Sequence, residues 1–418
     1  MILTAKQEEA LKLAVNRYNV GMPYTVIAGY AGAGKSTLVK FIVSALGFEE
    51  DDIAYIAYTG KAANVLKQKG CPNAMTAHKL LYYAKRNPNG TYKFSPRTTL
   101  DHNYKLIVVD EISMLPNELW ELLLSHRIYV LAMGDPGQLS PISGDAPPIL
   151  QNPHIFLDEI MRQAQESAII RLSMHIREGK DFRVFPTVSG EVRIVQHTWQ
   201  FPDEDETLLQ ASQVICGTND QRNKLNDRVR FLQGREKIPE VGDKIVSLHN
   251  HWDTISQTEN ALTNGAIGNI QEYHNYIQSY PKENKKFDGF PDTEIMKTSM
   301  ITDDGDIYGE LPIDYKCLLT GKPTLNGSQE YKLGSYNKSM IMRGMHSKYF
   351  DAMKYLKEIP YQFAYGYAIT CWKAQGSQYP YVLGYDCPWL KRKDAQEYIK
   401  YLYTLVTRAE KAVILVGD

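Results

Sequence analysis

The chain has 418 residues, of which 43% are hydrophobic and 23% are charged. This composition is typical of a globular protein and excludes a fully disordered, collagen-like or fibrous chain. Because the formal net charge is -1, any contact with nucleic acid must come from a locally basic surface rather than from a cationic whole. The length predicts about three domains, or two with a sizeable insertion.

Residues 1–150 alternate short β-branched runs with helical patterns. Compact apolar runs of this kind are typical of strands buried on both faces of a parallel sheet. The segments Ser36 to Leu46 and Lys61 to Lys69, which lie between such runs, are predicted as helices. The alternation predicts a doubly wound α/β domain. The predicted strands are Tyr24 to Ala28, Ile53 to Ala57, Leu106 to Asp110 and Ile128 to Met133.

A polar, basic and aromatic segment, Tyr82 to Tyr104, interrupts this alternation. It contains Asn87-Pro88-Asn89-Gly90, which is a strong turn signal. We therefore predict a small hairpin inserted into the first domain at about residues 82–104.

A second interruption follows in the latter half of the chain. From about Pro239 to Pro360 the composition shifts to Gly, Tyr, Asp, Asn and Lys with short alternating stretches, which predicts a β-rich insertion with long loops. The predicted domains are residues 1–150, a second α/β domain formed by 151–238 and 361–418 on a sheet begun near residue 150, and the insertion 239–360. The second domain is predicted to contain helices at Glu166 to Glu178, Asp220 to Leu232 and Asp394 to Thr407, and strands at Gln213 to Gly217, Tyr381 to Tyr385 and Ala412 to Val416.

The cysteines and the first residues of the chain indicate in which cellular compartment the protein works. Five scattered cysteines without a C-x-x-C pair favour reduced thiols over a disulfide framework or a zinc site. The start of the chain has no apolar signal segment, and no run of about 18 apolar residues occurs. We therefore expect a soluble cytoplasmic protein without membrane contact.

Gly29 to Ser36 fits the pattern G-x-x-x-x-G-K-[ST] directly after a predicted strand and before a predicted helix. In a P-loop the glycines let backbone N–H groups surround phosphates, and the helix N-terminus adds its positive end. Lys35 would reach the β- and γ-phosphates, and the Ser36 hydroxyl would ligate Mg²⁺. A glycine-rich turn that binds nothing is the alternative, and the flanking strand and helix argue against it.

Asp110 and Glu111 end an apolar strand with two adjacent carboxylates. We predict Asp110 as the Mg²⁺ ligand and Glu111 as the base that polarises the attacking water. An Asp-Glu pair at a strand end is commonly only a polar exit into a loop. The P-loop upstream favours the catalytic interpretation, because phosphoryl transfer needs both parts.

Eight segments in this order resemble the motifs of a superfamily 1 DNA helicase, most nearly its RecD-like and phage Dda-like branch. The resemblance covers most of the chain and implies two RecA-like P-loop domains, with an SH3-like fold for the β-rich insertion. The segments outside the P-loop are Leu3 to Gln7 (Q motif), Ala57 to Ala63 (motif Ia), Thr76 to Leu80 (T-x-H motif), Asp110 to Met114 (motif II), Gly134 to Pro141 (motif III), Arg162-Gln163 (motif IV), Ala368 to Ser377 (motif V) and Tyr403 to Arg408 (motif VI).

The resemblance implies roles at the nucleotide. Gln138 would sense the γ-phosphate and couple hydrolysis to movement, and Arg162 and Arg408 would act as arginine fingers from the second α/β domain. Gln7 would recognise adenine. The nucleotide contacts implied in this way are Gln7, Gly29, Gly32, Ala33, Gly34, Lys35, Ser36, Thr37 and Gly376.

A groove for single-stranded DNA is implied by motifs Ia, T-x-H and V, where hydroxyls, backbone N–H groups and cations would contact phosphates. Trp372 stands where relatives commonly have histidine, and it either stacks on a base or packs between domains. The residues implied in this groove are Thr59, Gly60, Lys61, His78, Thr370, Trp372 and Lys373.

The inserted hairpin around Asn87 to Phe94 would project at the duplex junction. Tyr92 or Phe94 could stack on the first base pair as a wedge, or their rings could pack on their own domain. The RecD-like and Dda-like branch moves 5′ to 3′, so the resemblance implies the same polarity here.

We therefore expect an enzyme that hydrolyses ATP with Mg²⁺ and unwinds DNA while stepping 5′ to 3′ along a single strand. The alternatives are a translocase that remodels nucleoprotein without efficient unwinding and a nucleotide-switched DNA-binding module. The resemblance implies a monomer acting on single-stranded DNA and forks in a bacterial or phage-infected cell, in replication, recombination or repair, with a single-stranded-DNA-binding protein as a further partner.

Overall fold

The computed structural model describes most of the chain and divides it into two compact units. Unit 1 comprises Met1–Leu81, Arg97–Lys224 and Ala368–Asp418, and unit 2 comprises Tyr82–Pro96 and Leu225–Tyr367. Among the described residues, no helix combines the length and apolar composition needed to cross a membrane. The described residues are 3–86, 92–140, 147–159, 166–258, 260–280, 284–303, 305–347, 351 and 355–417.

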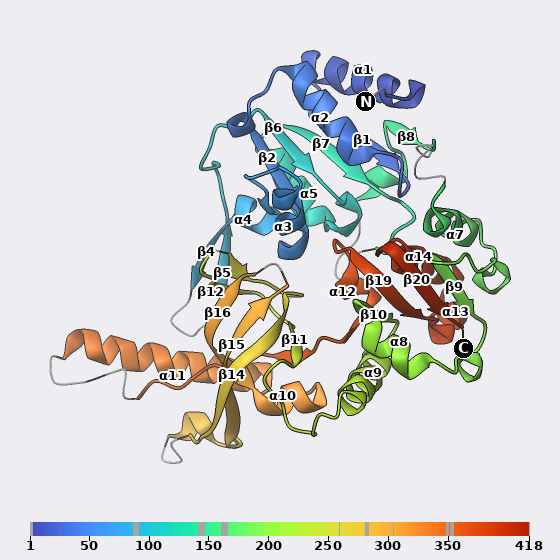
Figure 1. The fold of residues 1–418 in the computed structure, drawn as a ribbon. Coiled ribbons are helices and arrows are strands. Elements are labelled where there is room, and N and C mark those ends of the chain that lie inside the picture. Colours follow the sequence, from blue (N-terminus) through green and yellow to red (C-terminus); the bar gives the residue numbers. More distant parts are fainter. Residues whose placement is uncertain are drawn as a thin grey trace. The chain divides into compact units, whose positions relative to one another are not determined.

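Unit 1 contains two parallel sheets, and we name the part around each sheet a lobe (Figure 1). The first lobe holds a six-stranded sheet in the order β3-β2-β6-β7-β1-β8. Its strands are β1 (Tyr24–Gly29), β2 (Ile53–Ala57), β3 (Met75–Thr76), β6 (Leu106–Val109), β7 (Tyr129–Gly134) and β8 (Ile155–Leu157). Its helices are α1 (Ala5–Asn19), α2 (Lys35–Leu46), α3 (Gly60–Gln68), α4 (Ala77–Leu81) and α5 (Asn117–Ser125), with short 3₁₀ turns η1 (Glu50–Asp52), η2 (Ile112–Met114) and η3 (Pro148–Leu150).

The core of the first lobe forms where α1 and α2 pack on this sheet. Ala10 of α1 and Leu38 of α2 have no exposed surface and lie in one apolar cluster with Ile27 and Leu131 of the central strands. Burying one such Leu or Ile side chain contributes about 1.5–3 kcal/mol. All pairings in the sheet are parallel, so the loops that follow its strands meet at one edge.

The second lobe holds a five-stranded parallel sheet in the order β18-β10-β19-β20-β9. Its strands are β9 (Val192–Val195), β10 (Gln213–Cys216), β18 (Ala368–Thr370), β19 (Tyr379–Tyr385) and β20 (Ala409–Val416). Its helices are α7 (Ala168–Arg177), α8 (Glu204–Gln210), α9 (Asn219–Leu232), α12 (Cys371–Ala374), α13 (Pro388–Lys393) and α14 (Ala395–Val406), with 3₁₀ turns η4 (Phe182–Val184) and η5 (Thr198–Gln200).

The predicted α/β pattern is confirmed in both lobes, with most element ends shifted by only a few residues. The expectation that the last strands complete a sheet begun near residue 150 is wrong, since β8 joins the first sheet and the second begins with β9 at Val192. A three-residue strand such as β8 is too short to show which sheet it will join. All five cysteines are free in the structure, and four of them are buried.

Unit 2 is built around a five-stranded antiparallel sheet in the order β16-β15-β14-β11-β17. A second apolar cluster lies where Leu333, Tyr336 and Met340 of the 20-residue helix α11 pack on Tyr280 and Phe287. The strands are β11 (Lys244–Ser247), β12 (His251–Ile255), β13 (Ala261–Leu262), β14 (Ile267–Gln278), β15 (Thr293–Thr302), β16 (Ile307–Asp314) and β17 (Phe363–Tyr365), with helices α10 (Tyr315–Thr320) and α11 (Gly327–His346) and the turn η6 (Lys285–Phe287).

The β-rich character of this insertion is confirmed, but α10 and α11 are missing from the prediction. Helix α11 was missed because Gly327, Gly334 and Gly344 weaken its helical signal. Its start is nevertheless well defined, because Asn326 and Gln329 form a capping box.

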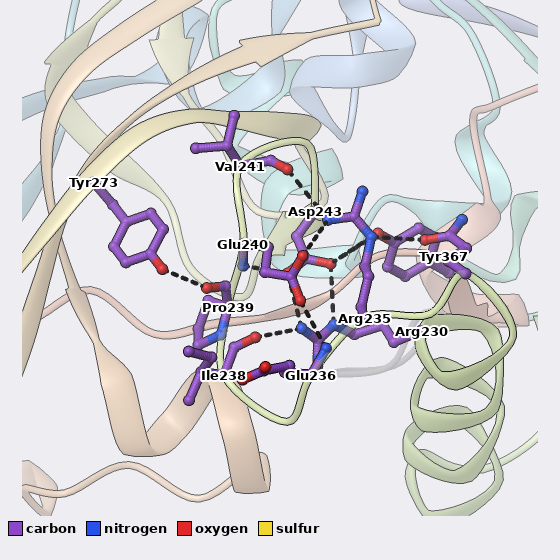
Figure 2. A network of polar contacts seen from close by, with 11 residues as sticks. Arg230, Arg235, Glu236, Ile238, Pro239, Glu240, Val241, Asp243, Tyr273 and Tyr367 are labelled. Atoms are coloured by element: carbon purple, nitrogen blue, oxygen red, sulfur yellow. Dashed lines mark hydrogen bonds and ion pairs between the residues drawn. The ribbon is translucent and has the colours of Figure 1, made fainter.

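A buried ion pair in unit 2 joins the segment where the chain enters this unit to the segment where it leaves (Figure 2). The carboxylate of Asp243 is fully buried and accepts from Arg230 at 3.0 and 3.1 Å. Arg235 lies 3.5 Å from the same carboxylate, and the Tyr367 hydroxyl donates to it at 2.9 Å. Because these groups satisfy one another, the end of α9 is fixed to the segment that leaves unit 2.

The predicted hairpin is confirmed as β4 (Tyr82–Arg86) paired antiparallel with β5 (Tyr92–Pro96). These two strands group with unit 2 rather than with the first lobe, which surrounds them in sequence. The predicted turn Asn87-Pro88-Asn89-Gly90 lies outside the described residues.

Candidate active site

The P-loop connects β1 to α2. Gly32 and Gly34 have φ angles of 80° and 75°, a left-handed conformation that strongly favours glycine. The Nζ atom of Lys35 donates to the carbonyl oxygens of Gly29 and Tyr30, at 2.7 and 3.0 Å. Lys35 is thereby held at the N-terminus of α2, where the helix dipole favours a phosphate.

Gln7 is buried and contacts this loop. Its Nε2 donates to the carbonyl oxygen of Ala33 at 3.1 Å, and its Oε1 accepts from the backbone N–H of Thr4 at 3.0 Å. The second bond belongs to the capping box that begins α1. Gln7 therefore fixes the start of α1 to the P-loop, and its reading of adenine stays a prediction.

A cavity of about 620 Å³ opens beside the first turns of α2. Two predicted nucleotide contacts, Ser36 and Thr37, line it with two lysines and an aromatic ring, a combination that suits a nucleoside phosphate. Its complete lining is Ser36, Thr37, Lys40, Phe41, Ser44 and Lys69.

Asp110 and Glu111 follow β6 directly. Burial and repulsion from Glu111 raise the pKa of Asp110 to about 6, against the opposing effect of Lys35. Glu111 has a positive φ of 53°, which is uncommon for a residue with a side chain and stores strain. Its Oε2 is buried and has no hydrogen-bond partner in the part of the chain that the structure describes.

These carboxylates suit a hard divalent cation. Mg²⁺ prefers oxygen ligands, and its charge would hold Asp110 ionised and offset the burial of the Glu111 oxygen. The described residues contain no group of three or more His, Cys, Asp or Glu side chains that could hold a metal ion by themselves. A cation here would therefore share its ligands with the Ser36 hydroxyl and with the phosphates of a nucleotide.

Arg408 reaches this site from the second lobe. Its Nη1 lies 3.7 Å from Oε1 of Glu111. The guanidinium is buried and also donates to the carbonyl oxygens of Thr404 and Ser377, at 3.1 and 3.2 Å. A rigidly held arginine opposite the Glu111 carboxylate is the arrangement that an arginine finger needs, and its catalytic role stays a prediction.

Gly376, a predicted nucleotide contact in motif V, lies close to Ala62 and Glu111 of the first lobe. Its φ is 72°, and a Cβ atom there would stand 2.8 Å from Cβ of Ala62 and 3.5 Å from Oε2 of Glu111. Only glycine allows this approach without displacing α3.

Motif III is hydrogen-bonded to the second lobe through both backbone groups of Leu139. The backbone N–H of Leu139 donates to Oγ1 of Thr404 at 3.0 Å, and its carbonyl accepts from Nε2 of Gln375 at 2.9 Å. The adjacent Gln138 is 8% exposed, and its Oε1 has no hydrogen-bond partner among the described residues. Gln138 therefore has a free acceptor beside elements of both lobes. The other predicted arginine finger, Arg162, lies outside the described residues.

The predicted DNA contacts of the first lobe lie where α3 and α4 begin. Thr59 caps α3 by accepting from the backbone N–H of Ala62, and Gly60 is the first residue of that helix. Lys61 reaches the second lobe, where its Nζ donates to the hydroxyl of Tyr379 at 3.2 Å and lies 4.6 Å from the centre of that ring. Burial lowers the pKa of His78 in α4, so this imidazole is neutral at physiological pH.

The contacts predicted in motif V surround the short helix α12. Thr370 is its N-cap, and the Trp372 ring lies 6.1 Å from the Tyr401 ring. This contact lies inside the second lobe and so is not the predicted packing between domains, and because part of the Trp372 surface stays exposed, stacking on a base stays a prediction. Burial and the nearby Arg222 lower the pKa of Lys373 to about 8.

The hairpin places Phe94 on β5 with 39% of its surface exposed. Its ring meets that of Tyr82 edge-on at 6.0 Å. The side chain of Tyr92 lies outside the described part of the structure. Phe94 is therefore accessible, while one side of it packs on the hairpin itself.

Two residues at the site escaped the sequence analysis. The hydroxyl of Tyr403 accepts from the backbone N–H of Ala31 at 2.9 Å, and the guanidinium of Arg177 lies 3.3 Å from the centre of the Tyr30 ring. Tyr403 opens motif VI, and its place in that motif is the signal that could have found it. Arg177 gave no signal, because a basic residue in the last turn of a helix is ordinary.

Comparison with known proteins agrees with this geometry. Residues 2–197 match the family model of an AAA domain, and residues 365–416 match that of a UvrD-like helicase C-terminal domain. The ATP-dependent RecD2 DNA helicase of Deinococcus radiodurans is 32% identical over 169 residues, which are 38% of this chain and 22% of that protein. The ATP-dependent DNA helicase dda of Enterobacteria phage T4 is 28% identical over 193 residues, 43% of each protein.

The fold as a whole matches solved structures. A structure of Bacteroides Pif1 bound to ssDNA has a TM-score of 0.50 and 16% identity, and the match covers 99% of this chain and 92% of that one. At this identity the likeness concerns the fold alone. The chain spans less than half the length of the curated relatives it matches.

The structure thus has a RecA-like P-loop fold of two lobes, with a P-loop in the first lobe and an arginine from the second lobe at the same site. The ordered motifs and the two family models make the chain similar to superfamily 1 helicases, and two of its curated relatives are a RecD2 helicase and the Dda helicase.

Proposed function

We propose that the protein is an ATP-dependent DNA helicase that translocates 5′ to 3′ on single-stranded DNA and unwinds duplexes. The observation that carries the proposal is the catalytic set assembled from both lobes, in which Arg408 of the second lobe stands 3.7 Å from Glu111 of the first. An active site completed by both lobes links nucleotide turnover to their relative movement.

Each residue of the site has a role that its geometry supports. Lys35 binds the β- and γ-phosphates at the N-terminus of α2, and Glu111 orients the attacking water and accepts its proton. Arg408 neutralises charge on the transferring phosphoryl group. Mg²⁺ bound through Ser36 and Asp110 would polarise the phosphate oxygens. Gln138, with its free acceptor, would sense the γ-phosphate.

Single-stranded DNA would bind along motifs Ia, T-x-H and V. The groove would use the hydroxyls of Thr59 and Thr370 and the cations of Lys61 and Lys373 for phosphates, and the exposed part of the Trp372 ring for a base. Lys61 supports this proposal because it connects the two lobes: it belongs to the first lobe, and its Nζ donates to the hydroxyl of Tyr379 in the second lobe. A strand bound there would respond when the lobes move.

We also assign an SH3-like fold to the five antiparallel strands of unit 2, and a strand-separating role to the hairpin β4–β5. Five antiparallel strands with irregular register between β14 and β15 and between β15 and β16 suit a small, strongly curved barrel. The proposal includes a monomer in the cytoplasm of a bacterial or phage-infected cell, working in replication, recombination or repair beside a single-stranded-DNA-binding protein.

The test is ATP turnover with and without single-stranded DNA, followed by unwinding of duplexes with either a 5′ or a 3′ tail. We expect turnover that DNA stimulates and that needs Mg²⁺, with unwinding only from the 5′ tail. Stimulated turnover without unwinding would indicate a translocase, and DNA binding without turnover would indicate a nucleotide-switched module. Unwinding from the 3′ tail would contradict the proposed polarity.

A further inference from the structure

One peptide unit of the P-loop is bonded on both of its sides. The carbonyl oxygen of Tyr30 accepts from Nζ of Lys35 at 3.0 Å, while the N–H of Ala31, in the same peptide unit, donates to the hydroxyl of Tyr403 at 2.9 Å. Tyr403 belongs to α14 in the second lobe. A single planar peptide therefore connects a helix of the second lobe to the catalytic lysine of the first.

The Tyr403 hydroxyl is itself fully engaged. It donates to Oδ2 of Asp135 in motif III at 2.5 Å, while it accepts from Ala31. The Tyr403 side chain has no exposed surface, and burial together with the nearby Asp135 raises the pKa of its hydroxyl, which therefore stays protonated. Asp135 is 2% exposed and also accepts from the N–H of Gly137 at 2.9 Å.

The same turn of the P-loop is held by a second side chain from the second lobe. The guanidinium of Arg177 of α7 lies 3.3 Å from the centre of the Tyr30 ring, and the same ring also meets Phe156 of β8, edge-on at 4.8 Å. Nη1 of Arg177 is buried and has no hydrogen-bond partner within the described residues. A guanidinium nitrogen buried without a hydrogen bond costs free energy, and the contact with the Tyr30 ring offsets part of that cost.

We propose that Tyr403 and Arg177 are positioning residues that set the Tyr30–Ala31 peptide, and through it Lys35, according to the place of the second lobe. The inference rests on the proposed ATPase function and deepens it. Arg408 acts on the phosphoryl group, whereas Tyr403 acts on the loop that holds the phosphates. Lobe movement then reaches the nucleotide through the P-loop backbone as well as through the arginine finger.

The experiment compares Tyr403→Phe with Tyr401→Phe in the full chain. Tyr401 is a matched control because it lies on the same helix, is equally buried, and donates to the carbonyl oxygen of Tyr385 inside its own lobe. Both variants lose one buried hydroxyl, so both should lower the melting temperature. Only Tyr403→Phe should lower the DNA-stimulated kcat, by about tenfold, which corresponds to about 1.4 kcal/mol.

Three further readouts keep the inference falsifiable. Tyr403→Phe should lower the stimulated rate more than the basal rate and should change KM for ATP, and Arg177→Gln should act in the same direction while leaving the Tyr403 contacts in place. If Tyr403→Phe and Tyr401→Phe showed the same kinetics, the positioning role would be wrong. A wild-type protein without ATP turnover would overturn the proposed function together with this inference, whereas the variant comparison overturns the inference alone.

Discussion

Arg408 and Glu111 form an ion pair across the two lobes of unit 1, with Nη1 and Oε1 3.7 Å apart. The arginine is fixed inside its own lobe by Thr404 and Ser377, so the pair depends on the approach of the lobes and not on a flexible side chain. The other carboxylate oxygen of Glu111 has no partner in the described part of the chain. That oxygen can accept a proton from water while Arg408 holds its neighbour.

Glu111→Gln should therefore separate binding from chemistry. Glutamine keeps the size of the side chain but cannot act as a base, so ATP should still bind while turnover falls by about 10²- to 10⁴-fold. Lys35→Ala should weaken nucleotide binding as well, because it removes the charge beside the phosphates. Binding is measured by fluorescent-nucleotide titration and turnover by phosphate release. Glu118→Gln on the exposed start of α5 is the control, and near-normal turnover of Glu111→Gln would show that the base is wrongly assigned.

Arg408→Ala should lower kcat by about 10³-fold, as expected for an arginine finger. Since Arg408 also donates three hydrogen bonds inside its lobe, the melting temperature should fall as well. Arg183→Ala provides the comparison, because Arg183 pairs with the buried Asp386 at 2.6 Å in the same lobe and lies outside the nucleotide site. The two variants should lose similar stability, and only Arg408→Ala should lose turnover. If the two variants had equal turnover, the role of Arg408 would be structural only.

Gly376→Ala tests the close approach of motif V to the first lobe. The new Cβ would stand 2.8 Å from Cβ of Ala62, which should push α3 away from the second lobe and lower DNA-stimulated turnover severalfold. Gly234→Ala is the control, since Gly234 has nearly the same φ of 71° and open space around it. Gly234→Ala should thus show only the cost of a positive φ. Equal stimulated turnover in the two variants would contradict the idea that this approach matters.

The sequence was sufficient for the parts of the molecule that local chemistry determines. The strand, glycine loop and helix around Lys35 follow from residues that are neighbours in the chain, and so do the carboxylates at the end of β6. The order of the motifs also predicted that Arg408 and Glu111 act at the same site, although the two residues are far apart in sequence. Position within a motif carried that prediction, since an isolated arginine is most often a surface ion pair.

Contacts without a local signal could not be predicted. The N–H of Ala31 meets Tyr403 only because two lobes pack together, and no periodicity in either segment encodes that contact. Helix α11 was also missed because its burial depends on tertiary packing. Its apolar residues contact Tyr280 and Phe287, which lie between β14 and β15. Tertiary packing thus overrides a weak helical propensity.

DNA affinity should depend on pH through Lys373. Burial lowers the pKa of this lysine to about 8 in the free protein, so its positive charge is complete below that pH and is lost above it. Because phosphates bind the charged form, DNA affinity should be full near neutral pH and should weaken as the pH rises through about 8. Binding of a fluorescent oligonucleotide at constant salt measures the effect. In Lys373→Gln the affinity should be lower and this pH step should vanish, and an unchanged step would assign it to another group.

Strand separation should depend on one face of the hairpin β4–β5. Ala84 pairs with Phe94 and Tyr82 with Pro96, so Tyr82 and Phe94 share a face, while Tyr83 and Ser95 lie on the other. Tyr92→Ala/Phe94→Ala should reduce unwinding of a 5′-tailed duplex severalfold and leave ATP turnover on single-stranded DNA unchanged, because the wedge acts only at the junction.

Tyr83→Ala is the matched control for the wedge, since Tyr83 is an exposed tyrosine, 48% accessible, on the opposite face of the same hairpin. It should unwind as well as the unaltered protein, which separates loss of a stacking ring from general loosening of the hairpin. Undiminished unwinding by the double variant would remove Tyr92 and Phe94 from the junction and leave the motor assignment intact. A loss of single-strand-stimulated turnover in the double variant would instead place these rings in the path of the translocating strand, because a wedge ahead of the motor cannot slow hydrolysis where no duplex is present.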